Sequence, residues 1–390
     1  MDFYLKQLLE EAKQACEKYG RFSVPSIFIG GGTPTIMSGD GIAKILDTIG
    51  QLFHVENGAE VSIEGNPGTL TQDWLEKARS AGANRLSFGA QAFQNELLKT
   101  LGRIHSRDEI FEAVEMARKE GFGNLNIDLM YGLPGQSTQQ WQESLECALE
   151  TGVEHVSCYS LIAEEGTPLT KRIERGELSV PGDEAVLAMQ RMAAQVLKKG
   201  GLERYEISNY AKPGFECRHN IGYWRRGDYL GLGCAAHSLM RGERFCNDPT
   251  LDGYFSGGIG LEREALSTED EAEEAVMLEL RTVAGIDLSA FKARYGIDFA
   301  KEYARGIGIL CENGVKNTFE KAGLLTFDLG ATEREMATNL YGLLREAEKR
   351  VDVLIAVEPK KQDGVMIGVM NRLKKACLST DIPREGRGQG

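Results

Sequence analysis

The sequence predicts an α/β protein built on a parallel sheet that helices cover. Three observations indicate this class: short apolar strands alternate with amphipathic helices from Ser26 to about Ile162, the strands are nearly continuous apolar runs, and helix start signals lie between them. Right-handed helical crossovers would join such strands into an open sheet or a barrel. We expect five strands, which begin at Ser26, Glu60, Arg85, Leu125 and His155.

Capping residues mark the helices between these strands. The segments SRDE and STQQ, which begin at Ser106 and Ser137, are capping boxes, and Gly121 and Gly152 follow the last turns of the same helices. The chain begins with an amphipathic helix over residues 2–20. A barrel built from these units would therefore lack the strand before that helix.

The alternation of strands and helices fades after about Pro168. A helix over residues 183–200 leads into an aromatic-rich stretch that ends at Trp224, and helical patterns dominate from Thr268 to about Asn317. The tail predicts a helix, a strand and a second helix over residues 331–350, 351–359 and 364–377, before a disordered end. These changes divide the chain into expected regions 1–170, 171–260, 261–325, 330–378 and 379–390.

Composition limits the classes of function. The net charge of -13 and the lack of a basic stripe argue against a nucleic-acid partner. No apolar run approaches the roughly 18 residues of a membrane helix, and no charged-then-apolar leader begins at Met1, so we expect a cytoplasmic protein. The eight cysteines include no CxxC or CxxxC pair, which favours reduced, mostly buried thiols.

Polar residues gather where the predicted strands end. The segment IFIGGGTPT (residues 27–35) ends a strand in three glycines, which let a ligand lie against the backbone, although a plain tight turn is the alternative. Taken singly, Glu64 could cap a helix, Asp128 could bond a loop, and Arg103 could be a solvated helix-end charge. Parallel strands bind ligands at their carboxyl ends, where these polar residues lie. Taken together, the residues suit a zwitterionic ligand that carries a sugar. The candidate residues are Gly31, Gly32, Thr33, Glu64, Gln91, Arg103 and Asp128.

Several ordered motifs resemble one known family. The segments are GGGTPT, EGNPGTL, RLSFGAQAFQNELLKTLGRIH, NIDLMYGLPGQ, YSLIAEEGTPL and YLGLGCAAHS, spread from about Asp2 to Asn317. They are similar to the oxygen-independent coproporphyrinogen III oxidase-like group of the radical S-adenosylmethionine (radical SAM) proteins. The resemblance implies a partial (βα)6 barrel without its first strand, a small, mostly helical C-terminal domain and an extra α/β tail. It also implies that the seven candidate residues bind SAM, with the methionine ammonium on backbone carbonyls of residues 30–35.

The motif HNIGYW resembles the HNxxYW motif of the heme chaperones within this group. It contains His219, Asn220, Tyr223 and Trp224. An imidazole can ligate heme iron, and aromatic faces can pack on the macrocycle. Without the resemblance, a buried histidine beside two core aromatic residues is the simpler interpretation.

Two features depart from the family. Its members carry CxxxCxxC, whose thiolates bind a 4Fe–4S cluster; this sequence has no such triplet, so we expect an N-terminally truncated version that does not assemble the cluster by itself. Residues 331–377 resemble the C-terminal tail of threonylcarbamoyl-AMP synthases, to which we assign no activity. An ordinary helix–strand–helix extension is the alternative.

The first functional hypothesis is a cytoplasmic heme chaperone that binds heme and SAM and passes heme to acceptor proteins, without its own cluster ligands. The second is an oxygen-independent coproporphyrinogen III oxidase (dehydrogenase) of porphyrin biosynthesis, which converts propionates to vinyl groups. A phosphate-binding α/β enzyme of another kind would leave the other motifs unexplained. Acceptor proteins are the expected partners, with peripheral membrane contact through them, and an open strand edge would favour a homodimer.

Overall fold

The computed structural model describes residues 2–302, 307–321, 323–351, 353–357 and 359. Its contacts divide the chain into two compact units, residues 1–285 and 286–390. Among the described residues, no helix combines the length and the apolar character needed to cross a membrane.

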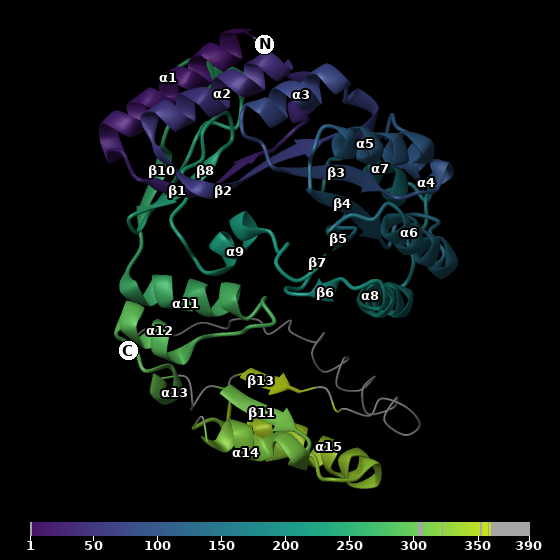
Figure 1. The fold of residues 1–390 in the computed structure, drawn as a ribbon. Helices are drawn as coiled ribbons and strands as arrows, with labels where there is room; N and C mark the ends of the chain where they lie inside the picture. The colour runs from purple at the N-terminus through teal and green to yellow at the C-terminus, as the bar shows by residue number, and fades with distance from the viewer. Residues whose placement is uncertain (1, 303–306, 322, 352, 358, 360–390) are drawn as a thin grey trace. The chain divides into compact units, whose positions relative to one another are not determined.

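A curled, seven-stranded sheet in the order β1-β2-β3-β4-β5-β7-β6 organises the first unit (Figure 1). Strands β1 to β5 pair in parallel, which confirms the five predicted strands and the α/β class. The short β7 extends the sheet antiparallel to β5, and β6 pairs antiparallel to β7. The strands are β1 (Ser23–Ile29), β2 (His54–Gly65), β3 (Arg85–Gln91), β4 (Asn124–Tyr131), β5 (His155–Ser160), β6 (Glu203–Arg204) and β7 (Asn209–Ala211).

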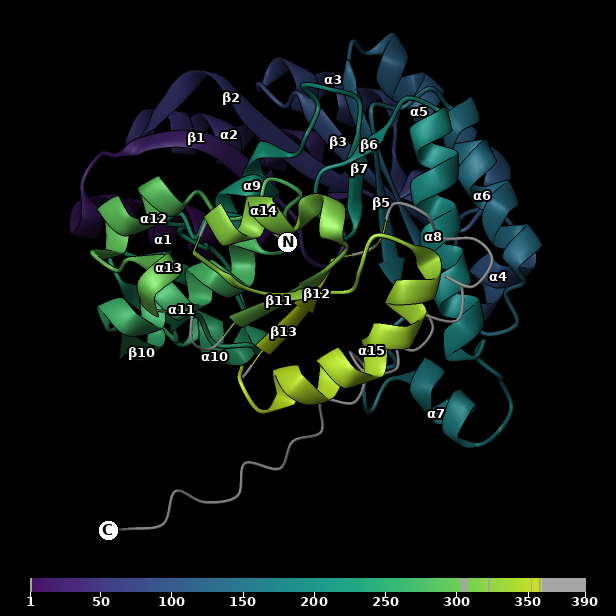
Figure 2. The ribbon, with the colours of Figure 1, turned by 90° about the horizontal axis from the view of Figure 1, so that it is seen from below.

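Helices cover the convex face of this sheet, and their layer follows its curve (Figure 2). The capping boxes predicted at Ser106 and Ser137 both form. The helices are α1 (Asp2–Tyr19), α2 (Gly39–Leu52), α3 (Gln72–Ser80), α4 (Asn95–Thr100), α5 (Arg107–Lys119), α6 (Thr138–Glu150), α7 (Pro168–Glu174) and α8 (Asp183–Lys199), with 3-10 turns η1 (Pro34–Ile36) and η2 (Pro67–Thr69).

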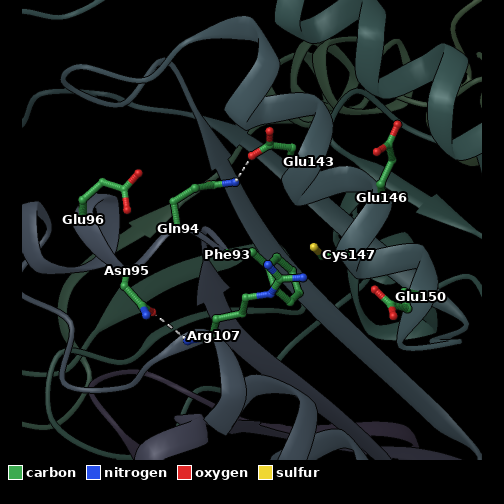
Figure 3. A pocket seen from close by; sticks show the side chains of 9 residues that line it. All are labelled: Phe93, Gln94, Asn95, Glu96, Arg107, Glu143, Glu146, Cys147 and Glu150. Atoms are coloured by element: carbon green, nitrogen blue, oxygen red, sulfur yellow. Dashed lines mark hydrogen bonds between the residues drawn. The ribbon is translucent and has the colours of Figure 1, made fainter.

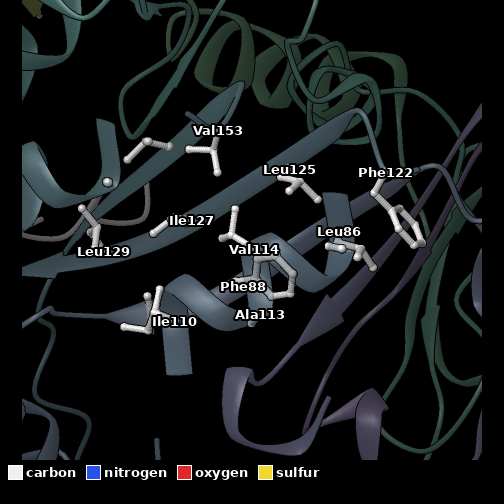
Figure 4. Close-up of a cluster of buried hydrophobic side chains, with 14 of the residues drawn as sticks. Leu86, Phe88, Ile110, Ala113, Val114, Phe122, Leu125, Ile127, Leu129 and Val153 are labelled. Atoms are coloured by element: carbon white, nitrogen blue, oxygen red, sulfur yellow. The ribbon is translucent and has the colours of Figure 1, made fainter. Parts of the chain in front are cut away.

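The two faces of the sheet differ because side chains alternate along each strand. Leu86, Phe88, Leu125 and Ile127 are fully buried against the helices (Figure 4). The opposite, concave face is polar, which is unusual for a parallel sheet, whose strands are generally apolar on both faces. Its residues include Glu60, Ser62, Glu64, Arg85, Ser87, Asn126, Asp128, His155 and Ser157.

Helix α9 (Arg218–Trp224) lies on this concave side and packs against β1 (Figure 1). A second, antiparallel sheet follows it in the order β10-β9-β8. The sequence analysis did not anticipate this sheet, because its strands are short and carry many charged residues. These later elements are β8 (His237–Met240), β9 (Glu243–Cys246), α10 (Leu251–Phe255), β10 (Leu261–Ala265) and α11 (Thr268–Glu279).

The second unit contains a parallel sheet in the order β12-β11-β13. Helix α15 (Glu333–Glu348) and strand β13 (Val353–Ala356) form where the tail predicted them. Strands β11 (Ile307–Cys311) and β12 (Leu325–Asp328) were not predicted, because apolar runs this short do not distinguish strand from helix. The helix predicted at 364–377 and the end at 379–390 lie outside the described residues. The other helices are α12 (Leu288–Tyr295), α13 (Phe299–Glu302) and α14 (Asn313–Lys321).

Glu11 joins α1 to the segment that follows α9. The residue is 4% exposed, and its carboxylate accepts hydrogen bonds from Gly233 N (2.8 Å), Asn247 Nδ2 (2.6 Å) and Tyr254 Oη (2.6 Å). Each donor is thereby satisfied out of water, where an unpaired polar group would be costly.

Replacing Glu11 with alanine should therefore destabilise the first unit by about 2–4 kcal/mol, because three donors lose their acceptor. Chemical denaturation monitored by circular dichroism measures this change. Glu10→Ala is the matched control: Glu10 is exposed and pairs only with Lys13, so its loss should cost less than about 0.5 kcal/mol. Equal stability of the two variants would contradict the role of Glu11.

Candidate functional site

The glycine loop that follows β1 is shaped by contacts within the chain. A Cβ on Gly30 would lie 2.5 Å from a ring carbon of Phe28 and 2.9 Å from the carboxyl carbon of Glu64, so only glycine fits there. Gly31 and Gly32 have φ values of +83° and +63°, which glycine adopts at little cost. The Gly31 N–H donates to Glu64 Oε2 at 3.1 Å. The loop is therefore held against the end of β2.

Three charged candidates interact electrostatically at these strand ends. Burial raises the pKa of Glu64, the Gly31 hydrogen bond opposes that rise, and the charge of Asp128 adds to it. The charge of Asp128 also acts on the guanidinium of Arg103, an exposed residue. The structure thus brings Gly31, Glu64, Arg103 and Asp128 into one neighbourhood.

The remaining candidates are Gly32, Thr33 and Gln91, which lie at the same edge of the sheet. Thr33 precedes η1, and Gln91 ends β3 with a φ of +68°, an uncommon value for a residue other than glycine. Among the described residues, neither side chain hydrogen-bonds to Glu64, Arg103 or Asp128. No such bond involves Gly32 either.

Asp128 is held by polar neighbours on the concave face. Its Oδ2 accepts a hydrogen bond from Ser87 Oγ at 3.1 Å, and its Oδ1 accepts one from Asn126 Nδ2 at 2.8 Å. Burial raises the pKa of Asp128, and these hydrogen bonds together with the charge of Arg85 oppose the rise. The side chain is therefore fixed before any ligand arrives.

A chain of hydrogen bonds runs from Asn126 across the concave face. Asn126 Nδ2 donates to Asp128, so the other amide atom, Asn126 Oδ1, is an acceptor. His155 Nδ1 must therefore donate to Asn126 Oδ1. His155 Nε2 then accepts from the Tyr205 hydroxyl at 2.8 Å, and that oxygen accepts from Cys217 N at 3.2 Å. The Cys217 thiol donates to Glu60 Oε1 at 3.3 Å. Burial lowers the pKa of His155 well below its usual value, which agrees with the neutral tautomer.

Glu60 anchors the first turn of α9. Its carboxylate accepts hydrogen bonds from Arg218 N at 2.9 Å and His219 N at 3.2 Å, two of the N–H groups that a helix leaves free at its start. A negative charge is also favourable at this end of a helix. The concave face therefore fixes where α9 begins.

His219 has one engaged and one free ring nitrogen. Its Nδ1 lies 3.0 Å from Ser26 Oγ, and its ring stacks on Phe28 with centroids 5.1 Å apart and meets Tyr223 edge-on at 4.8 Å. No group in the described part of the chain hydrogen-bonds to Nε2. Burial lowers the pKa of His219, the charge of Glu60 opposes that effect, and the charge of Arg85 adds to it. The imidazole is thereby kept in its neutral, metal-ligating form.

The other residues of HNxxYW surround His219 on α9 and are partly buried. Tyr223 meets Tyr229 edge-on at 4.7 Å, which continues an aromatic run from Phe28. Arg281 lies over the Trp224 ring at 4.3 Å, and Trp224 Nε1 is buried without a partner.

A surface pocket of about 530 Å³ lies elsewhere, among the outer helices (Figure 3). Glu143, Glu146 and Glu150 of α6 line one side and Arg107 the other, and Gln94 donates to Glu143. None of the candidate residues lines it. The pocket is thus separate from the strand ends and from α9.

The described residues contain no group of three His, Cys, Asp or Glu side chains placed to hold a metal ion.

The sequence analysis missed the hydrogen-bonded residues that link the strand ends to α9: Glu60, Asn126, His155, Tyr205 and Cys217. It also missed Arg85, which is buried on the same face. A signal for the strand residues was present, because polar residues recur at every second position in otherwise apolar strands, as in Asn126 and Asp128. No local signal marks Tyr205 or Cys217, which reach the face from irregular segments.

Comparison with known proteins agrees with this architecture. The radical SAM superfamily matches residues 4–148, and the HemN C-terminal domain matches residues 266–332. The chain is similar to the protein "Heme chaperone HemW" of Bacillus subtilis, with 35% identity over 332 residues that cover 84% of this chain and 88% of the relative. The Lactococcus lactis protein of the same name is 34% identical and covers 79% and 81% of the two chains.

A solved structure has a similar fold. Coproporphyrinogen III oxidase (HemN) from Escherichia coli, described as a radical SAM enzyme, superposes with a TM-score of 0.68 and 26% identity, covering 78% of this chain and 74% of the other. These comparisons confirm the family that the motifs predicted. The resemblance of residues 331–377 to threonylcarbamoyl-AMP synthases, the domain boundaries and the assignment of site residues stay predictions.

Glu64→Gln should raise the melting temperature of the ligand-free protein at pH 7. The folded state raises the pKa of Glu64, so its ionised form destabilises the fold at neutral pH, and this penalty disappears as pH falls through the folded pKa. The glutamine oxygen can still accept from Gly31. Thermal melts of both proteins between pH 4 and pH 8 should therefore converge at the acidic end; a variant less stable at pH 7 would contradict this account.

Proposed function

Because the chain belongs to the radical SAM superfamily, in the family of the heme chaperones HemW, we propose that it binds heme and SAM and transfers heme to acceptor proteins. The free Nε2 of His219 is the observation that carries the heme part of this proposal. A cytoplasmic location is part of it as well.

The surroundings of His219 suit an iron ligand. A ligating histidine is generally oriented by a hydrogen bond at its other nitrogen, and here Ser26 supplies that bond to Nδ1. The Phe28 and Tyr223 rings restrict the imidazole further and offer apolar faces near a flat macrocycle. Heme would supply a Lewis-acidic iron, while this chain would supply an oriented neutral imidazole and aromatic packing.

The strand ends suit an amino-acid ligand that carries a sugar. Arg103 would pair with the methionine carboxylate, since a guanidinium matches that group in charge and geometry. Glu64 and Asp128 would accept hydrogen bonds from ammonium or hydroxyl groups, which are donors. The backbone of Gly31 and Gly32 would lie against the ligand, and Thr33 and Gln91 would complete the edge.

The radical SAM superfamily uses SAM together with a 4Fe–4S cluster. The fold is shared with a coproporphyrinogen III oxidase, which keeps oxidative decarboxylation as a second candidate. Anaerobic incubation of the protein, reconstituted with iron and sulfide, with coproporphyrinogen III, SAM and a reductant separates the two candidates, because only the oxidase would form protoporphyrinogen.

His219→Ala should abolish stoichiometric heme binding, since no other group would hold the iron. Titration with ferric heme, followed at the Soret band and by dialysis, measures the loss, which we expect to exceed tenfold in Kd. His54→Ala is the matched control, because His54 is an exposed histidine at the start of β2 and should leave binding unchanged. Unaltered binding by the His219→Ala variant, or no binding by the natural sequence at micromolar heme, would refute the heme assignment.

Arg103→Gln should weaken SAM binding by about ten- to hundredfold, the usual cost of losing a hydrogen bond to a charged group. Equilibrium dialysis with labelled SAM measures it. Arg107→Gln removes another exposed arginine, one that lines the outer pocket, and serves as the control. If both variants bind SAM as the natural sequence does, Arg103 is not a ligand-binding residue.

A further inference from the structure

Arg85 presents a buried positive charge without a direct counterion. It begins β3, and only 2% of its surface is exposed. Its Nε–H has no acceptor, and among the described residues no carboxylate forms an ion pair with it. Removing a charge from water is costly unless a partner compensates for it. An anionic ligand that bound beside Arg85 would compensate for this buried charge.

The carboxylates on the same face are already engaged. Glu60 accepts from the backbone N–H groups of Arg218 and His219 and from the Cys217 thiol. Asp128 accepts from Ser87 and Asn126. The charges of Asp128 and Arg85 interact from a distance, but within the described part of the chain neither carboxylate forms an ion pair with the guanidinium.

The pairing of the strands places Arg85 in the same side-chain row as Phe28, which contacts the His219 ring. Phe28, on which the His219 ring stacks, pairs with Ser62, and Ser62 pairs with Arg85. Two strand spacings separate the backbones of Phe28 and Arg85, or about 10 Å. Glu64, in contrast, pairs with Ser87, one side-chain row closer to the carboxyl ends of the strands.

We propose that Arg85 binds a propionate carboxylate of the porphyrin whose iron is held by His219, an inference that rests on the proposed heme-binding function. A porphyrin carries its metal at the centre and its carboxylates at the rim, so one molecule can reach both residues. A guanidinium recognises a carboxylate through two parallel hydrogen bonds.

The carboxylate of SAM is the other source of the same chemistry. The register favours the porphyrin, because Arg85 shares the row of Phe28 whereas Glu64 and its neighbours form the next row. The charge of Asp128 interacts with both Arg85 and Arg103, so the sheet register is the observation that favours the porphyrin.

The test compares ferric heme with its dimethyl ester, in which both propionates are neutral. The natural sequence should bind heme about ten- to hundredfold more tightly than the ester. Arg85→Met should reduce this preference to near unity and leave SAM binding unchanged, while Arg85→Lys should keep part of it. Arg118→Met is the matched control: Arg118 lies on α5, pairs with Glu154 at 2.8 Å, and should not affect the preference.

Stability separates a ligand-binding role from a structural one. Because Arg85 lacks a direct partner, Arg85→Met should melt no lower than the natural sequence without ligand, whereas Arg118→Met, which breaks an ion pair, should melt lower. Equal binding of heme and ester by the natural sequence, a preference retained in Arg85→Met, or loss of SAM binding in that variant would overturn the proposal. If the natural sequence binds neither porphyrin, the proposed function itself fails.

Discussion

The hydrogen-bonded chain on the concave face depends on one constraint: its polar groups must be satisfied away from water. Asn126 fixes the directions of the bonds, because its amide donates to Asp128 and accepts from His155. The remaining donors and acceptors then have a single consistent arrangement, through Tyr205 and Cys217 to Glu60. Since an unsatisfied member would cost about 1–3 kcal/mol, the whole set orders together.

This arrangement joins two regions that are far apart in sequence. The strand ends carry Glu64 and Asp128, whereas α9 carries His219, and the hydrogen-bonded residues between them belong to the sheet and its extension. A small-molecule site at the carboxyl ends and a metal ligand on α9 can therefore share one rigid support. The support is built from strands, which hold side chains more accurately than loops do.

The sequence predicted much of the fold because its signals are local. Strand periodicity located β1 to β5, and the capping boxes at Ser106 and Ser137 located two helices. Short segments such as β11 escaped prediction, since five apolar residues fit either a strand or a buried helix turn. The antiparallel strands β8 to β10 escaped because pairing between partners, rather than composition, defines them.

Local signals also explain why only part of the candidate site could be predicted from the sequence. Residues at strand ends can be read from the order of strand and loop, which is why the sequence points to Glu64, Asp128, Thr33 and Gln91 as candidates. Arg85 and Glu60 lie inside strands, and their importance depends on which face they occupy and on what lacks a partner there. Those are properties of the assembled sheet.

The buried thiol in the hydrogen-bonded chain has a chemical consequence. Cys217 is 0% exposed, and burial raises its pKa to about 11, so almost no thiolate exists at neutral pH. Thiolates, rather than thiols, react with peroxide and alkylating reagents. The connection between the sheet and α9 is accordingly inert toward oxidants, a useful property beside any iron-containing ligand.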